Sequence, residues 1–308
     1  MKKTNQPSFA VVRPLDWTTA FSEGQWEALQ ERYASGHSAG MTSIEDLDKF
    51  VLFAHDIAPD ALKRYRLWVD TVAFGRGLES PFIGAGGMCM LHYYCILRYP
   101  MGIRYELNAT RVRGLKRVEA ADTIALAWLH GGPFGMNIAA QMAYEYMKDW
   151  DPKDDGPGFP WPAGWSVDPE AFASGIDLTE GGERNEISKG DLEKIEDWHR
   201  RVEGEVPAYV PFLAENYPLA LRVFRARFET TTQRSLPKQF IALCWLQLAG
   251  LWHRPDALRR AIHMCRVFGV EKDQAIHVLS LNHVYQGHVG MSASVEGAIE
   301  LLRDWKQG

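Results

Sequence analysis

The sequence predicts an all-α fold of two tandem helical repeats, on three observations. No segment alternates apolar and polar residues between hairpin turns, as paired strands do. Apolar residues instead recur at helical spacing between Pro and Gly residues that begin and end helices. Finally, the chain aligns with itself, because residues 89–150 match residues 244–305 without a gap. Such a repeat identifies the folding unit before any motif is considered.

The matched positions are those that shape a helical unit. They include Pro100 and Pro255, Gly114 and Gly269, and Asp149-Trp150 and Asp304-Trp305. Upstream, the match continues at a slightly larger offset, from Val51 on Val210 to Thr71 on Thr230. Each repeat therefore spans roughly 105 residues, which is a common size for a domain.

The helices are clearest in the second repeat. Leu221, Phe224 and Phe228 have helical spacing, and Pro255 suits the first turn of a helix, where its missing N–H is not needed. Gly269 suits the position just after a helix end. The expected elements are a short helix at 22–35, helices at 218–233, 238–252, Pro255 to Gly269 and 271–285, a turn between Gly287 and Gly290, and a last helix at 292–305, with Pro59, Pro100, Gly114 and Gly132 as the boundaries in the first repeat.

The segment between the repeats has a different composition. Residues 151–193 are rich in Pro, Gly, Asp and Trp, which favours an irregular linker. The alternative is an ordered flap in which Phe159, Trp161 and Trp165 pack over a cleft between the repeats, since exposed tryptophan surface is costly. The predicted regions are an N-terminal extension with the first repeat at 1–150, a linker or flap at 151–200, and the second repeat at 201–308.

The bulk properties exclude several classes of protein. The chain has 308 residues, is 46% hydrophobic and carries a net charge of −5, which argues against a general electrostatic nucleic-acid binder. It has no apolar run of the roughly 18 residues that a transmembrane helix needs. The N-terminus lacks the apolar region of a secretory signal, and the four cysteines form no C-x-x-C pair. We therefore expect a cytoplasmic protein with reduced thiols and with no membrane or nucleic-acid partner.

Two segments of the second repeat carry a family resemblance. They are LPKQFIALCWLQLAG at 236–250 and RVFGVEKDQAIHVLSLNHVYQG at 266–287, and Gly114-Leu115 and Gly131-Gly132-Pro133 fill the matching positions of the first repeat. This pattern resembles the carboxymuconolactone decarboxylase family, which includes the AhpD-like alkylhydroperoxidase proteins. The resemblance covers both repeats and implies an all-helical, oligomeric protein with sites near repeat or subunit boundaries.

The chain departs from the peroxidase members of that family. Those members carry a C-x-x-C-x-x-x-H motif. The matching positions hold Tyr99, Gly102 and Glu106 in the first repeat and Arg254, Ala257 and Ala261 in the second. Without a thiol pair, dithiol reduction of a peroxide has no chemical route. The decarboxylase-like branch of the family, or a repurposed member of it, remains.

Cofactor-independent chemistry on a small acid needs a cation, a proton donor or acceptor, and a pocket that excludes water. The segment 91–106 supplies these residue types, and we predict catalytic roles for His92, Tyr99 and Glu106. His92 and Tyr99 share a helical face if the helix extends that far, and Glu106 occupies the position of the family's histidine, where burial would raise its pKa. The predicted substrate-binding residues are Tyr94, Arg98, His130, Trp161 and His283.

Each candidate also has a purely structural interpretation. His92 would then be a core histidine, the tyrosines packing residues with hydrated hydroxyl groups, and Glu106 a solvated helix residue. Arg98 would lie in a surface pair.

The histidines of the second repeat, His263, His277, His283 and His288, suggest a metal site, but their spacing does not support one. His277 and His283 lie about 240° apart around a helix, and no carboxylate four residues away completes a pair. We expect no metal and no cofactor.

Two functions remain open. The first is a decarboxylase-like lyase that acts by acid/base catalysis, through decarboxylation, isomerisation or ring opening, on a small carboxylated or lactone-like metabolite. The alternative is a non-catalytic binding or assembly protein that retains the fold only. The polar side chains concentrated in the first repeat favour the enzyme, and the loss of the thiol motif from both copies favours the alternative. The expected partners are a small-molecule substrate and further copies of the chain, as a dimer or trimer.

Overall fold

The computed structural model describes residues 18–37, 49–73, 75–80, 82, 85–177, 179 and 182–305. In these residues the secondary structure consists of helices alone, so the predicted all-α class is confirmed. The helices of the N-terminal half are α1 (Glu23–His37), α2 (Lys49–Ile57), α3 (Pro59–Ala73), α4 (Ala85–Leu97), α5 (Pro100–Val112), α6 (Arg117–Gly131) and α7 (Pro133–Met147). Those of the C-terminal half are α8 (Lys189–Glu203), α9 (Tyr209–Asn216), α10 (Pro218–Thr232), α11 (Lys238–Leu251), α12 (Pro255–Val267), α13 (Lys272–Ser294) and α14 (Ile299–Arg303), with short 3-10 turns η2 (Pro152–Asp154), η3 (Pro169–Phe172) and η4 (Glu296–Ala298).

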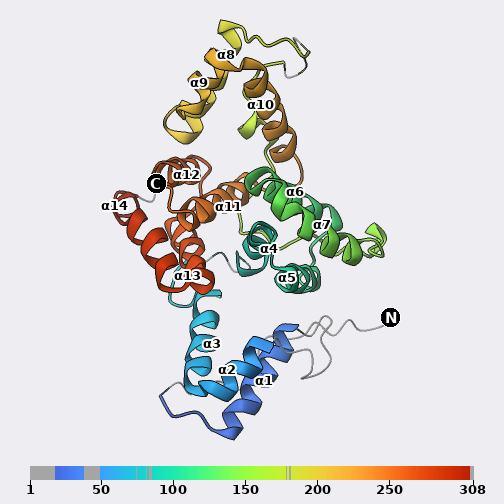
Figure 1. Ribbon diagram of the computed structural model, residues 1–308, viewed down its shortest axis with the longest axis vertical. Helices are drawn as coiled ribbons and strands as arrows, with labels where there is room; N and C mark the ends of the chain where they lie inside the picture. The colour runs from blue at the N-terminus through green and yellow to red at the C-terminus, as the bar shows by residue number, and fades with distance from the viewer. Residues whose placement is uncertain are drawn as a thin grey trace.

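The molecule has a central body with one three-helix arm on either side (Figure 1). Helices α4–α7 and α11–α14 form the body, α1–α3 form one arm and α8–α10 the other. A large hydrophobic core runs through both halves of the body, and each arm has a smaller core of its own.

The two halves interlock, since each arm packs against a body helix of the other half. Helix α10 packs against α6, α3 packs against α13, and α4 meets α11 in the centre (Figure 1). Polar contacts lie at two of these junctions, one of them made by the loop that follows α10. Asp122 on α6 accepts hydrogen bonds from the backbone N–H and hydroxyl of Ser235, and the His277 imidazole on α13 lies 2.5 Å from the carbonyl oxygen of Val72. The α10–α6 and α3–α13 contacts therefore each draw residues from both halves.

Equivalent positions of the two halves have the same backbone geometry. Arg98 and His253, between the first two body helices of each half, both adopt a left-handed conformation, with φ of 60° and 53°. The next boundary is a left-handed glycine in both halves, Gly114 and Gly269. These similarities are what the predicted duplication would produce, and the tandem repeat itself stays a prediction.

Two predicted helices differ in the structure. The expected helix at 292–305 is broken, because α13 continues past its non-helical residue Gly287 to Ser294 and is followed by η4 and α14. His92 and Tyr99 do not share a helical face, because α4 ends at Leu97 and does not extend as far as Tyr99. Arg98 is left-handed and Tyr99 is extended ahead of Pro100, so the chain turns between the two side chains.

The segment after the first half is docked against the body. Phe159, Trp161 and Trp165 pack around Phe82, and the Trp161 ring also contacts Phe240 on α11. Residues 151–177 are thus held in place, although most of them lie outside regular secondary structure. The end of the predicted linker region belongs to α8, whose N-cap is Ser188.

One carboxylate fixes this docking. Glu119 on α6 accepts hydrogen bonds from the Phe159 backbone N–H and from the Trp161 indole N–H, at 3.1 Å each.

Candidate functional site

A cavity of about 250 Å³ lies where the C-terminal arm meets the body. This is several times the ~30 Å³ that one water molecule occupies in the liquid. Most of the wall is aliphatic and aromatic, which suits a small apolar ligand. The lining residues are Leu129 and His130 from α6, Phe172 from η3, Ile195, His199 and Glu203 from α8, Pro207, Tyr209 from α9, Leu221, Phe224, Arg225 and Phe228 from α10, Ile241 and Trp245 from α11, and Arg260 and Met264 from α12.

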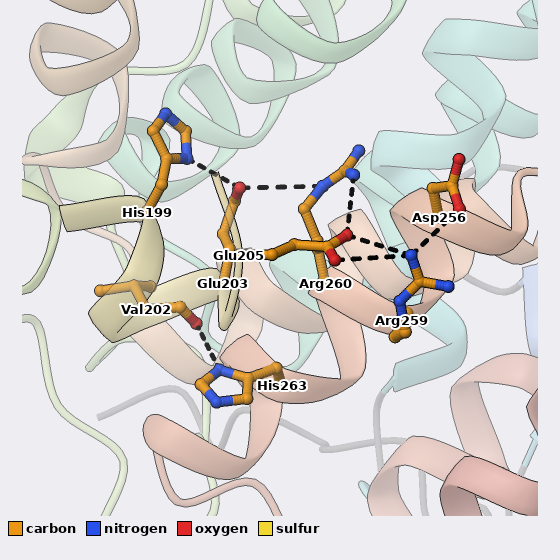
Figure 2. A network of polar contacts seen from close by, with 8 residues as sticks. All are labelled: His199, Val202, Glu203, Glu205, Asp256, Arg259, Arg260 and His263. Carbon is orange, nitrogen blue, oxygen red and sulfur yellow. Dashed lines mark hydrogen bonds and ion pairs between the residues drawn. The ribbon is translucent and has the colours of Figure 1, made fainter. Parts of the chain in front are cut away.

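A histidine–carboxylate pair forms part of the wall on α8. His199 and Glu203 are one helical turn apart, so their side chains lie on the same face. His199 Nδ1 is 2.8 Å from Glu203 Oε2, and both side chains are buried. Because a carboxylate only accepts hydrogen bonds, the proton of neutral His199 lies on Nδ1. The other ring nitrogen, Nε2, points away from Glu203 (Figure 2). In this tautomer Nε2 carries a lone pair.

Arg260 on α12 extends this pair into a network. Its Nε lies 3.8 Å from Glu203 Oε2 and its Nη1 lies 3.3 Å from Glu205 Oε1 (Figure 2). Glu205 also contacts Arg259, which is exposed to solvent. The network therefore runs from the cavity wall to the surface, and Arg260 is a guanidinium next to the histidine–carboxylate pair.

A buried ion pair supports the opposite wall on α10. Arg225 Nε is 2.6 Å from Glu229 Oε1, and the side chains are only 3% and 4% exposed. The guanidinium donates to the carbonyl oxygen of Phe172 and lies over the Trp198 ring, 4.1 Å from its centroid. Glu229 accepts from the backbone N–H and the hydroxyl of Ser174. These contacts satisfy both charges and tie η3 to α10.

Two histidines meet on the α6 side of the cavity. His92 Nε2, on α4, lies 2.9 Å from His130 Nδ1, on α6. Burial lowers the pKa of His130 to about 3 and also lowers the pKa of His92, so both rings are neutral at pH 7. His130 lines the cavity and its ring contacts Trp245.

The depressed pKa of His130 predicts a loss of stability in mild acid. The unfolded chain has a His pKa near 6.5, so it takes up a proton as the pH falls below that value, whereas folded His130 stays neutral until about pH 3. The free energy of unfolding should therefore fall by about 1–2 kcal/mol between pH 7.5 and pH 5 on account of this residue. Urea titrations at the two pH values measure the change, and His130→Gln should remove this part of it. If the free energy of unfolding of that variant depended on pH as strongly as that of the wild type, the assignment of this loss to His130 would be contradicted.

Three of the predicted site residues, Tyr94, Tyr99 and Glu106, lie in a different cluster. The Tyr94 hydroxyl donates to Tyr285 Oη on α13, at 2.9 Å, and the Tyr99 ring packs 5.2 Å from the Tyr94 ring. Glu106 is buried nearby, and its pKa is raised by burial. This cluster lies where α13 meets the N-terminal half, the counterpart of the position where α6 meets the C-terminal half. The solvated interpretation of Glu106 is therefore wrong.

Burial of Glu106 predicts a variant that is more stable than the parent. Its folded pKa lies above the unfolded value of about 4.3, so the carboxyl destabilises the fold increasingly as the pH rises above that value. Glu106→Gln should raise the free energy of unfolding by about 1 kcal/mol at pH 8 and have little effect at pH 4. Denaturant unfolding at the two pH values measures this. Glu145→Gln, an exposed carboxyl, is the control; a Glu106 variant no more stable than this control at pH 8 would contradict the assignment.

The other predicted binding residues lie apart from the cavity. Arg98 is exposed, with its guanidinium 5.4 Å from the centre of the Phe134 ring. Trp161 belongs to the docked linker, and His283 packs edge-on against Trp68 on α3, with ring centroids 4.2 Å apart. In the described part of the chain, His130 is the one residue of the eight predicted site residues that lines the cavity. His92 contacts the His130 side chain.

The other polar residues of the cavity wall were not identified from the sequence. His199 and Glu203 lie at the boundary between the predicted linker and the second repeat, and the signal that identifies them is their spacing of four in WHRRVE. Arg225 and Glu229 have the same spacing and match Arg66 and Asp70, which also form an ion pair, at 2.8 Å. These pairs are visible in the sequence, but their burial is not.

No group of three His, Cys, Asp or Glu side chains is arranged to hold a metal ion within the residues that the structure covers. His277 and His263 instead contact backbone carbonyl groups, those of Val72 and Val202. Among the described helices, none has the length and apolar content that a membrane crossing requires. Comparisons with protein-family models, with curated proteins and with solved structures find no match to this chain.

Proposed function

We propose that the protein is an enzyme that transfers protons, without a cofactor, on a small, mostly apolar metabolite that carries a carboxylate or a lactone ring. The substrate occupies the cavity between the C-terminal arm and the body. Decarboxylation, isomerisation next to a carbonyl group and opening of a lactone ring all need a positioned proton acceptor and a group that holds developing negative charge. The resemblance to carboxymuconolactone decarboxylases supports the same class of reaction.

The observation that carries this proposal is the His199–Glu203 pair in an apolar wall. The hydrogen bond to Glu203 fixes the proton on Nδ1 and leaves Nε2 as a base. When Nε2 takes a proton, the adjacent carboxylate stabilises the imidazolium that forms. A histidine held in this way can act as a general base.

The substrate's charge has a partner beside this base. Arg260 lines the cavity, with its Nε 3.8 Å from Glu203 and its Nη1 3.3 Å from Glu205. A substrate carboxylate at this position would form charge-assisted hydrogen bonds. The aromatic and aliphatic remainder of the wall fits the apolar part of the molecule.

The thiols support the exclusion of dithiol peroxidase activity. All four cysteines are buried and free. Burial raises the pKa of Cys95 to about 12 and raises the pKa of Cys244 and Cys265 as well. A thiol of this kind is not a thiolate at neutral pH and is a poor nucleophile.

A hydrogen–deuterium exchange assay tests the proposal without knowledge of the natural substrate. Levulinate carries a carboxylate and a ketone, and γ-valerolactone carries a lactone ring, so both present acidic C–H groups beside a carbonyl. We expect the wild-type protein in D₂O to speed the exchange of these protons, followed by proton NMR, with saturation at millimolar probe concentrations. Pentanoate, which lacks the ketone, is the control. Absence of protein-dependent exchange with both probes would contradict the proposal.

The same experiment distinguishes the enzyme from the non-catalytic binding or assembly protein. The His199–Glu203–Arg260 network also joins α8 to α12, as a structural connection would. A binding or assembly protein would give saturable shifts of the probe resonances without exchange. That outcome favours the binding function and excludes the enzyme for these two ligand classes.

We also propose that the chain forms a homo-oligomer, a dimer or trimer, in the cytoplasm. Large apolar side chains on the surface, including Phe53, Phe134 and Phe212, support the homo-oligomer. The free thiols support the cytoplasmic location. Light scattering of the purified protein measures the oligomeric state, and a monomer at micromolar concentration would contradict it.

A further inference from the structure

The His92–His130 pair has an unusual hydrogen-bond balance. His92 is completely buried in α4, and its Nε2 faces His130 Nδ1 at 2.9 Å. Within the described chain, the other ring nitrogen of His92, Nδ1, has no hydrogen-bond partner. His130 uses Nδ1 for the contact, so Nε2 is the nitrogen that it has left for a ligand in the cavity.

Two arrangements of the shared proton satisfy this geometry. If His130 donates from Nδ1, neutral His92 must carry its own proton on Nδ1, where a buried N–H group would lack an acceptor. If His92 donates from Nε2, its Nδ1 has only an unused lone pair. A buried N–H without a partner is rarer in proteins and costlier than a buried acceptor without one. The second arrangement is therefore favoured, and it leaves the proton of His130 on Nε2.

We propose that His92 is a positioning residue that holds His130 in the Nε2–H tautomer, so that the cavity presents a neutral N–H donor to a carbonyl oxygen of the substrate. The identification of the ligand as a substrate rests on the proposed function, whereas the tautomer does not. The ligand class is thereby narrowed to small molecules with a ketone or lactone carbonyl oxygen, such as keto acids and lactones.

The comparison of the two halves supports a specific role for this pair. The positions equivalent to His92 and His130 hold Gln247 and Tyr285. Tyr285 bonds Tyr94, and Gln247 contacts the sulfur of Met90 at 3.9 Å, so the second pair does not repeat the first. The fold accommodates other residues at these positions, and the histidine pair occurs only beside the cavity. The lowered pKa of both rings keeps the donor neutral at the pH of the reaction.

The two histidines that line the cavity then have complementary roles. His199 Nε2 accepts a proton from the carbon next to the carbonyl group, and the C–H electron pair moves to form an enolate. The enolate oxygen accepts a hydrogen bond from His130 Nε2–H, which keeps its proton. His199 returns its proton to carbon and completes an isomerisation, or exchanges it with water and gives the exchange measured above. A neutral imidazole is known to serve as such an electrophile.

Nitrogen NMR of the wild-type protein labelled with ¹⁵N-histidine tests the tautomer directly. We expect His130, assigned by loss of its signals in His130→Gln, to show a protonated Nε2 and an unprotonated Nδ1 at pH 7. A wild-type His130 with its proton on Nδ1 overturns the inference, whether or not the protein is an enzyme. This result needs no variant of His92 to fold.

Two substitutions then test the role of His92. The side-chain amide of His92→Gln keeps a donor near the position of Nε2, and the chain itself has Gln at the equivalent position 247. His92→Leu has no donor, so we expect His130 to lose its single tautomer and levulinate to bind on the order of tenfold more weakly, with pentanoate unchanged. We expect His92→Gln to behave as wild type. Equal effects of both substitutions on both ligands would overturn the positioning role.

Discussion

Replacing His199 by Gln is expected to lower the rate of protein-dependent exchange of levulinate protons by about 10²- to 10³-fold. Glutamine retains a polar group of similar size but has no basic nitrogen, so the loss reflects the base and not the shape of the wall. The lone pair on His199 Nε2 exists because Glu203 accepts from Nδ1 at 2.8 Å, so Glu203→Gln should also slow exchange, by a smaller factor.

His263→Gln is the matched control for this substitution. His263 lies on α12 close to the same network, contacts the Val202 carbonyl oxygen and is not part of the cavity wall (Figure 2). The His263→Gln variant should therefore exchange levulinate protons at the wild-type rate. Equal losses in the His199 and His263 variants would mean that the network is structural. A His199 variant with wild-type exchange would exclude His199 as the base.

The second large effect is on stability. Arg225→Met should lower the free energy of unfolding by about 3–5 kcal/mol, because it leaves the Glu229 carboxylate buried without its partner. The pair is 2.6 Å apart, and the same guanidinium holds the Phe172 carbonyl group at the cavity wall. Urea denaturation at pH 7 measures the change.

An exposed pair of the same spacing provides the comparison. Arg200 and Glu196 on α8 are also one turn apart, but the Arg200 side chain is 53% exposed, and Arg200→Met should leave stability unchanged within error. The double variant Arg225→Met/Glu229→Leu should recover much of the loss, because it removes both buried charges. A double variant as unstable as the single one would show that the damage comes from packing around Trp198 and Phe172 and not from the orphaned carboxylate.

Much of the fold follows from the sequence because its boundaries depend on local chemistry. Pro218 and Pro255 begin α10 and α12, and Gly269 adopts the left-handed backbone expected after a helix end. The end of α4 depends on Arg98, a residue of a type that rarely adopts a left-handed backbone but does so there. His253 makes the same turn two residues before Pro255, so this boundary has the same geometry in both halves.

The site was harder to predict than the helices. Most of the candidates came from the first repeat, with Trp161 from the linker and His283 from the second repeat, and His130, with its partner His92, is the link between those candidates and the cavity. Whether a polar residue faces a cavity depends on which helix of the other half packs over it. The interlocking of α10 with α6 has no local signal, so the base on α8 and the donor on α6 could not be placed together from spacing alone.

The packing of each arm on a body helix of the other half affects how such a site can change by mutation. In a symmetric assembly of two identical chains, every substitution appears at both interfaces, and neither can specialise alone. Here both interfaces are encoded separately within one chain. One interface keeps an open cavity between His130 and Arg225, and the other places Tyr285 and Glu106 in its interior. One interface can therefore carry the proposed reaction while the other stabilises the fold. A mutation that improves the function of one interface need not weaken the other interface.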